Sequence, residues 1–197
     1  LLAGVVMSVS FTFDMMPSKY GSIKSCASHR SSGERRRNVN LYVLSEDNNG
    51  QLILATETLK QNLKMWLGQK KMMGDTVDIK DAKIINYGIE FNIIADSTTN
   101  KYEVLNRAIE AIKSSFSQPL YIGEKLYITD IYSALSKVRG VVDAKNVKIN
   151  FKSGTGYSSN SMDINSVLSS DGLTIETPQN VALEMKYTSS DINGSVS

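Results

Sequence analysis

The clearest pattern in the chain is an alternation of apolar and polar residues from Val5 to Phe13. Apolar side chains occupy its odd-numbered positions, and hydroxyl side chains occupy the even positions from 8 to 12. Because successive side chains of a strand point to opposite faces, this alternation predicts a half-buried strand over 5–13. A second apolar run at 39–44 predicts another strand, and the Asn-Asn-Gly sequence at 48–50 predicts a turn after it.

Between these two strands the chain is polar and interrupted by turn residues. Pro17 and Gly21 predict a turn, and residues 20–27 favour the start of a short helix. Residues 28–38 combine charged and hydroxyl side chains with Gly33, which predicts an exposed loop or hairpin tip.

Two segments carry apolar residues at helical spacing. The first begins near Thr56, a suitable N-cap, and ends at Gly68 or Gly74. Its apolar face holds Leu59, Leu63, Trp66 and Leu67. The second covers 101–117 and has Asn100 as its cap. Its predicted apolar face is formed by Tyr102, Leu105, Ile109, Ile112 and Phe116.

Further strands are predicted where apolar and polar residues alternate. One extended segment begins at 77–79, and residues 85–93 alternate along one face. A short element at 120–127 precedes a third helix over 130–139, which Thr129 caps and Gly140 stops. A strand over 146–152 completes this part of the chain.

The remaining residues are richer in small polar side chains. Residues 153–172 predict a mobile loop or linker, with a short helix near 164–168. Residues 173–175 and 181–187 predict a hairpin-like pair around Pro178. The last ten residues predict a frayed end.

This order of elements predicts an α+β fold, with small mixed sheets covered by amphipathic helices. The unit from 84 to 151 resembles a split β-α-β arrangement. Three parts are expected: a first α+β module over 1–82, incomplete at its start, a second over 83–152, and a linker with a hairpin-like segment over 153–197.

Charge adds one local feature. The net charge is 22 − 20 = +2, and residues 29–37 contribute 4 − 1 = +3 of charge, so the rest of the chain is close to neutral. The basic side chains of this loop are Arg30, Arg35, Arg36 and Arg37. Three interpretations stay open for the loop: solvated charges, contact with a protein partner, or binding of nucleic acid phosphate. Single-strand binding needs a row of exposed aromatic residues, which is not seen beside it.

The sequence offers little for catalysis. The chain has one cysteine, Cys26, and one histidine, His29, in a polar stretch where a plain cysteine is favoured over a Cys–His pair. Phosphate-binding and zinc-binding motifs are not found. We therefore expect no enzyme activity, no cofactor, no metal and no small-molecule substrate. The sequence contains no apolar run of about 18 residues, so it predicts no membrane-spanning helix.

Several segments resemble the baseplate J-like family, and within it the ring-forming wedge proteins of contractile-tailed (myovirus) phage baseplates. They are LYIGEKLYITDIYSALSKVRGVVDAKNVKINF at 120–151, NVNLYVLSEDNNGQL at 38–52 and LKQNLKMWLGQKKMMGDTVDIKDAKIINYGIEFNI at 59–93. MPSKYGSIKS at 16–25 and VALEMKYTSSDINGSV at 181–196 add to them. The order is kept throughout, and the segments cover most of the chain. HRSSGERRR at 29–37 departs from the pattern, which leaves the role of that loop undefined.

The resemblance implies a structural role. The chain would be the C-terminal part of a longer wedge protein, and it would join itself, as a dimer or ring, and other wedge proteins around the hub. Its location would be the tail baseplate of a virion, assembled in the host cytoplasm. The alternative is a small α+β nucleic-acid-binding module that uses the basic loop 29–37.

Overall fold

The computed structural model describes residues 23–30, 38–69 and 76–197, so the strand predicted over 5–13 lies outside the described part. The described residues form two compact units. The first runs to Lys83 and also contains 121–123 and 179–181, and the second contains 84–120, 124–178 and 182–197. Mixed sheets and three α-helices among the described residues make the chain an α+β protein, as the sequence predicts.

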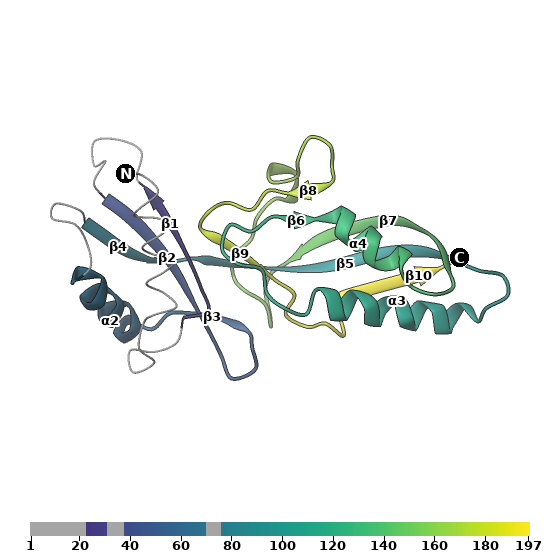
Figure 1. The fold of residues 1–197 in the computed structure, drawn as a ribbon, viewed down its shortest axis with the longest axis horizontal. Coiled ribbons are helices and arrows are strands. Elements are labelled where there is room, and N and C mark those ends of the chain that lie inside the picture. Colours follow the sequence, from purple (N-terminus) through teal and green to yellow (C-terminus); the bar gives the residue numbers. More distant parts are fainter. Residues whose placement is uncertain (1–22, 31–37, 70–75) are drawn as a thin grey trace. The chain divides into compact units, whose positions relative to one another are not determined.

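A four-stranded sheet forms the body of the first unit (Figure 1). Its central strand β2 (Asn38–Glu46) is antiparallel to β1 (Ser25–Arg30) and to β3 (Leu52–Leu54), and parallel to β4 (Thr76–Asp81). The predicted turn at 48–50 joins β2 to β3. Asp47 closes it, because its Oδ1 accepts hydrogen bonds from the backbone N–H groups of Asn49 at 2.8 Å and Gln51 at 2.9 Å.

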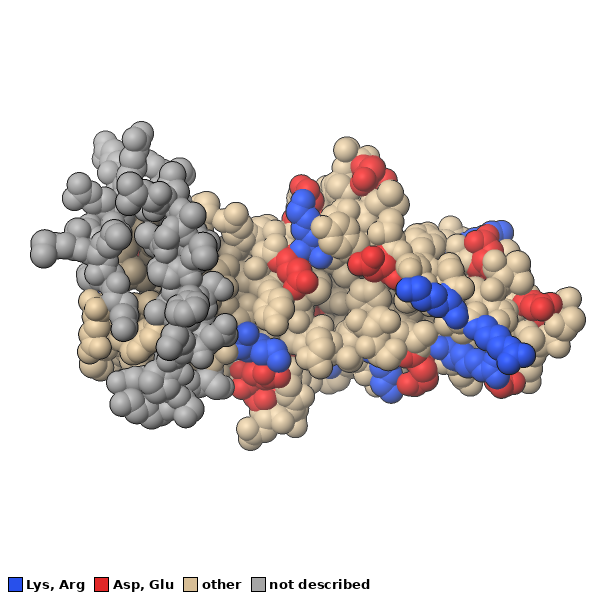
Figure 2. Space-filling model, viewed as in Figure 1, with Lys and Arg blue, Asp and Glu red and all other residues tan. Residues whose placement is uncertain are grey.

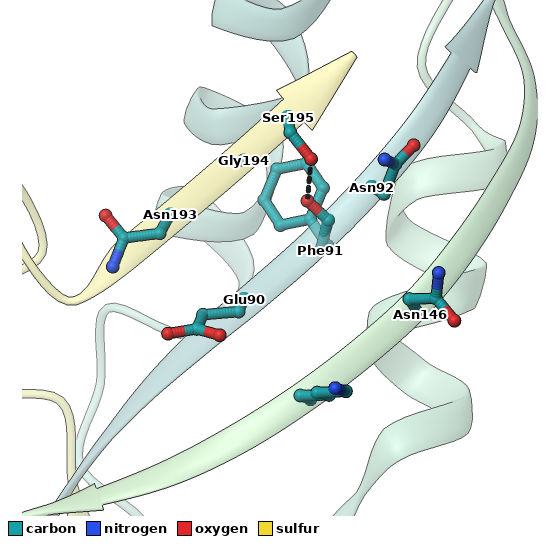
Figure 3. A pocket seen from close by; sticks show the side chains of 8 residues that line it. Glu90, Phe91, Asn92, Asn146, Asn193, Gly194 and Ser195 are labelled. Atoms are coloured by element: carbon teal, nitrogen blue, oxygen red, sulfur yellow. Dashed lines mark hydrogen bonds between the residues drawn. The ribbon is translucent and has the colours of Figure 1, made fainter. Parts of the chain in front are cut away.

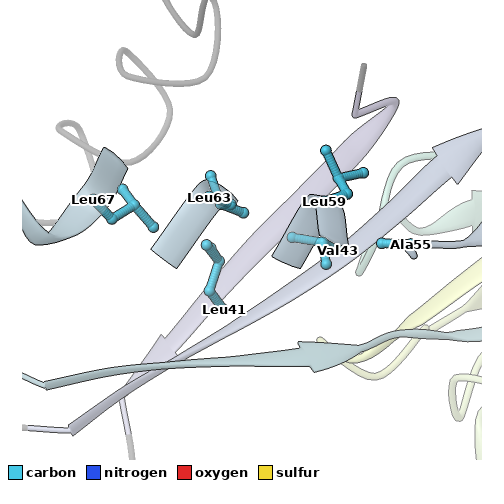
Figure 4. Close-up of a cluster of buried hydrophobic side chains, with 6 residues drawn as sticks. All are labelled: Leu41, Val43, Ala55, Leu59, Leu63 and Leu67. Carbon is cyan, nitrogen blue, oxygen red and sulfur yellow. The ribbon is translucent and has the colours of Figure 1, made fainter. Parts of the chain in front are cut away.

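Helix α2 (Glu57–Gly68) packs on one face of this sheet. Thr56 is its N-cap, as predicted, and its side chain accepts a hydrogen bond from the backbone N–H of Leu59. The helix contributes three leucines to the core, which Figure 4 shows facing the strand residues. The buried cluster is Leu41, Val43, Ala55, Leu59, Leu63 and Leu67.

Segments from later in the chain complete the first unit. The backbone N–H of Ile122 donates to Ser25 Oγ at 3.1 Å, and that of Gly123 donates to the carbonyl of Val181 at 2.8 Å. The backbone N–H of Lys83 donates to the carbonyl of Asn180 at 2.8 Å. The hydrogen bonds of this unit therefore depend on residues far apart in the sequence.

The second unit is built on a long central strand, β5 (Lys83–Ala95). Strand β10 (Ile192–Val196) pairs with it in parallel, and β7 (Val141–Lys152) pairs with it antiparallel on its other side. Strand β9 (Val181–Glu184) also pairs with β5. The two strands of the predicted split β-α-β arrangement, β5 and β7, are thus antiparallel neighbours, and the parallel partner of β5 is β10.

One face of this sheet is covered by α3 (Lys101–Ser115) and α4 (Ile128–Ser136), with α3 along β10 and α4 along β7 (Figure 1). The strand face beneath them is almost fully buried, at 0–3% exposure for Tyr87, Ile89, Phe91 and Ile93. Burial of this apolar layer stabilises the second unit by roughly 25 cal/mol per Å² of surface removed from water.

The predicted inner face of α3 is partly wrong. Ile112 is buried as expected, but Tyr102 is 75% exposed, and the other buried positions are Val104 and Ala108. Small side chains at 104 and 108 let the helix backbone approach the sheet, so the buried row runs at four-residue spacing through them. Helix α4 also differs, because it begins at Ile128 and its N-cap is Tyr127, which places the predicted cap Thr129 inside the helix.

The structure corrects the prediction for residues 20–38 as well. Residues 25–30 form β1 instead of the start of a helix, and Asn38 already belongs to β2. The predicted exposed loop is therefore shorter, and its middle, 31–37, lies outside the described residues. Cross-strand pairing explains the difference, since Ser25 to Arg30 lie opposite Leu44 to Val39 along their whole length.

The end of the chain differs most from the prediction. No hairpin forms around Pro178, because β8 (Thr174–Ile175) pairs with β6 (Leu126–Tyr127) while β9 pairs with β5. The last residues are not frayed, since 192–196 form β10. The short helix near 164–168 is confirmed as a 3₁₀ turn over Ile164–Ser166.

Candidate interaction surface

The structure describes little of the predicted contact loop. Arg30 is the last residue of β1, where it pairs with Val39. Arg35, Arg36 and Arg37 lie outside the described residues. The loop therefore remains a prediction, for protein contact and for nucleic acid alike.

Cys26 and His29 both lie on β1, opposite Val43 and Asn40 of β2. Residues three apart on a strand point to opposite faces, so this strand does not bring the thiol to the imidazole. Cys26 packs against the buried cluster beneath α2, and this burial raises the pKa of its thiol to about 11. The cysteine fills space in the core of the first unit.

The raised pKa predicts slow alkylation of the native protein. At pH 8 the thiolate fraction should be about 100-fold lower in the folded chain than in the unfolded chain, because burial disfavours the charged form. The rate of reaction with iodoacetamide, measured in buffer and in urea, should differ by about that factor. Equal rates would show that Cys26 is not held between β2 and α2.

Carboxylates of the first unit are used in ion pairs and hydrogen bonds. Lys60 Nζ lies 2.7 Å from Glu57 Oε1 and 2.7 Å from Asp81 Oδ2, which ties α2 to β4. The hydrogen bond to Asp81, more than that to Glu57, holds the pKa of Lys60 above its usual range. Asp78 accepts a 2.6 Å hydrogen bond from Asn38 Nδ2. Within the described ranges no group of three or more His, Cys, Asp or Glu side chains is placed to hold a metal ion.

A buried ionic cluster organises the second unit. Asp191 is fully buried; its Oδ1 accepts from Lys152 Nζ at 2.8 Å and from Tyr157 OH at 2.6 Å, and its Oδ2 accepts from the backbone N–H of Tyr187 at 2.8 Å. Burial would lower the pKa of Lys152, but the bond to Asp191 outweighs it and the pKa is raised. The rings of Tyr157 and Tyr187 meet edge to face, 5.4 Å apart.

A second buried pair holds the same loop. Asn86 Nδ2 donates to Glu184 Oε2 at 3.0 Å, and Asn86 Oδ1 accepts from the backbone N–H of Ser158 at 2.7 Å. Asn160 Nδ2 in turn donates to the carbonyl of Ile84 at 3.3 Å. The segment predicted as a mobile linker is thus fixed to β5 over 157–160. These charged and polar groups fix the loop to the sheet of the second unit.

The sheet face opposite α3 and α4 presents a row of polar side chains. Cross-strand pairs align Asn193 with Glu90 and Ser195 with Asn92 on the β10 side, and Glu90 with Lys148 on the β7 side. Between Lys148 and Lys145 the register shifts by one residue, and Asn146 there has a positive φ of 52°. This is a β-bulge, which re-aims side chains and strengthens the local twist.

A shallow groove of about 480 Å³ runs over this face, and Figure 3 shows the side chains that line it. Two hydrogen bonds hold its β10 side, from Ser195 Oγ to the carbonyl of Phe91 at 3.4 Å and from Ser197 Oγ to Asn92 Oδ1 at 3.3 Å. We refer to the following residues as the open-face set: Glu90, Asn92, Asn146, Lys148, Asn193 and Ser195. The sequence carries one signal for it, the polar residues 90 and 92 in the alternation of β5.

Charge on the described surface is mixed. In Figure 2 basic and acidic side chains lie next to one another over the second unit, with several basic ones toward the end that carries the start of α3. A one-signed field of the kind that drives non-specific nucleic acid binding is not seen on the visible face of these described residues.

Across the described residues, the helices are all too short or too polar to cross a bilayer. No protein-family model matches the chain. No curated protein matches it. Among solved structures it is similar to a chain of the cryo-EM structure of the anti-feeding prophage baseplate, six-fold symmetrised. The identity is 9% and the TM-score 0.43, and the match covers 77% of this chain and 29% of that chain.

Proposed function

We propose that this chain is a structural component of a contractile-tail baseplate. In this role it self-associates and binds other wedge proteins to form the ring around the hub, in the tail of a virion assembled in the host cytoplasm. The observation that carries the proposal is the ordered sequence resemblance, which runs from 16–25 through 38–52, 59–93 and 120–151 to 181–196.

Features of the described residues support a role in assembly. Carboxylates such as Asp81 and Asp191 form ion pairs with lysines that stabilise the fold. The one described cysteine packs against a core, where its raised pKa keeps it neutral. What the second unit offers to solvent is a wide polar sheet face, which suits contact with another folded surface.

The test is the location of the chain in particles. Contractile tails purified from cells that express it would be probed with an antibody against this chain, by immunoblot and by gold labelling in electron microscopy. We expect a fixed ratio to the sheath protein and label at the baseplate end of the tail. Tails that lack the chain, or label spread along the sheath, would contradict the proposal.

A further inference from the structure

The sheet β10–β5–β7 has two unlike faces. One is covered by α3 and α4 and buries Ile89, Phe91 and Ile93. The other carries the open-face set over a groove of about 480 Å³. Glu90, Asn146, Lys148 and Asn193 are exposed there. In the structure of residues 76–197 their side chains make no hydrogen bond or ion pair.

Glu90 and Lys148 at the centre of this face are direct cross-strand neighbours of opposite charge. Side chains at such positions have Cβ atoms about 5 Å apart, so the two charges form a short positive–negative row across β5 and β7. They are close enough to pair, but no ion pair joins them among the described contacts. Both charges are therefore available to a partner.

A row of one positive and one negative charge is complementary to itself after a two-fold rotation. The rotation places Glu90 of one copy against Lys148 of the other, and Lys148 against Glu90, so each contact occurs twice. We propose that the open-face set is the surface through which a second copy of this chain docks, with Glu90 and Lys148 as the reciprocal ion pairs. This inference rests on the self-association that the proposed function includes.

The β7 edge of the same sheet is a poorer site for the second copy. Strand β7 carries a β-bulge at Asn146, and charged side chains at Asp143, Lys145 and Lys148 lie along it. Bulges and lysines are the features by which proteins block strand-to-strand pairing at an edge. The open polar face is a better surface for a second copy than the β7 edge.

Charge reversal tests the pairing. Glu90→Lys makes the row fully positive, and Lys148→Glu makes it fully negative, so each variant repels a copy of itself. Each should weaken self-association at least about tenfold by analytical ultracentrifugation or light scattering, because a two-fold contact doubles the effect. Mixing the two variants at equal concentration should restore association, and the double variant should self-associate like the wild type.

Two controls isolate the charge effect. Glu110→Lys, on α3 and so on the covered side of the sheet, should leave association unchanged. All variants should melt within a few degrees of the wild type, because the changed side chains are exposed. Raising the ionic strength from about 0.05 M to 0.5 M should weaken wild-type association, since it screens exposed charges.

The outcomes separate this inference from the proposed function. Association of the wild type that survives both single reversals would overturn the docking face and leave baseplate assembly standing. Loss of association in both single variants without rescue in the mixture would also overturn the reciprocal pairing. A wild type with single-chain mass at every concentration would contradict the self-association on which both rest.

Discussion

Ile112→Ala is expected to lower the free energy of unfolding by about 2–5 kcal/mol, because it truncates a fully buried side chain of α3 and leaves a cavity. The matched control is Ile109→Ala on the same helix. Ile109 is only half-buried, so Ile109→Ala should lower the free energy of unfolding by less than about half as much as Ile112→Ala. Urea unfolding followed by circular dichroism measures both values. Equal losses would mean that the helix is rotated so that both isoleucines face the sheet.

The second large effect is expected at the buried ionic cluster. Asp191→Ala should cost about 3 kcal/mol, because Tyr157 OH and the backbone N–H of Tyr187 lose their acceptor and Lys152 loses its partner. Asp143→Ala, at an exposed position of β7, should change stability by less than about 0.5 kcal/mol.

The pH dependence of the same cluster follows from the raised pKa of Lys152. A lysine whose pKa is higher in the folded than in the unfolded chain contributes stability fully below its unfolded pKa of about 10.4. That contribution is lost as pH rises through the folded value. The stability difference between the wild type and Lys152→Met should therefore shrink above pH of about 10.5. A difference that grows with pH would show that the ammonium is not stabilised by Asp191.

Local patterns predicted the elements that depend on local contacts. Helix α2, its Thr56 cap and the turn at 48–50 were predicted correctly, because their spacing and capping residues lie within a few positions of one another. The inner face of α3 was misplaced because Tyr102 counts as apolar in the pattern, whereas burial depends on how closely Val104 and Ala108 approach the sheet.

Long-range pairing explains what the sequence could not show. The last ten residues are mostly small and polar and predict a frayed end, yet 192–196 pair with β5 in a parallel ladder. The open-face set is hidden for the same reason. The polarity of Glu90 and Asn92 is visible in β5, but the register that brings Lys148 and Asn193 beside them is not. The predicted contact loop at 29–37 stays a prediction, because its residues 31–37 lie outside the described part of the chain.

The distance along the chain between β5 and β10 also affects how the second unit folds. Its partners on β5 precede it by 192 − 89 = 103 positions, as between Ile89 and Ile192. At about 5–20 residues per second, ribosomes need roughly 5–20 s to add that length. During this time the edge of β5 that pairs with β10 is without that partner. Contacts of such long range slow folding further. The sheet can therefore be completed only after β10 has been synthesised, and a copy without β10 in place has no finished open face to offer a growing assembly.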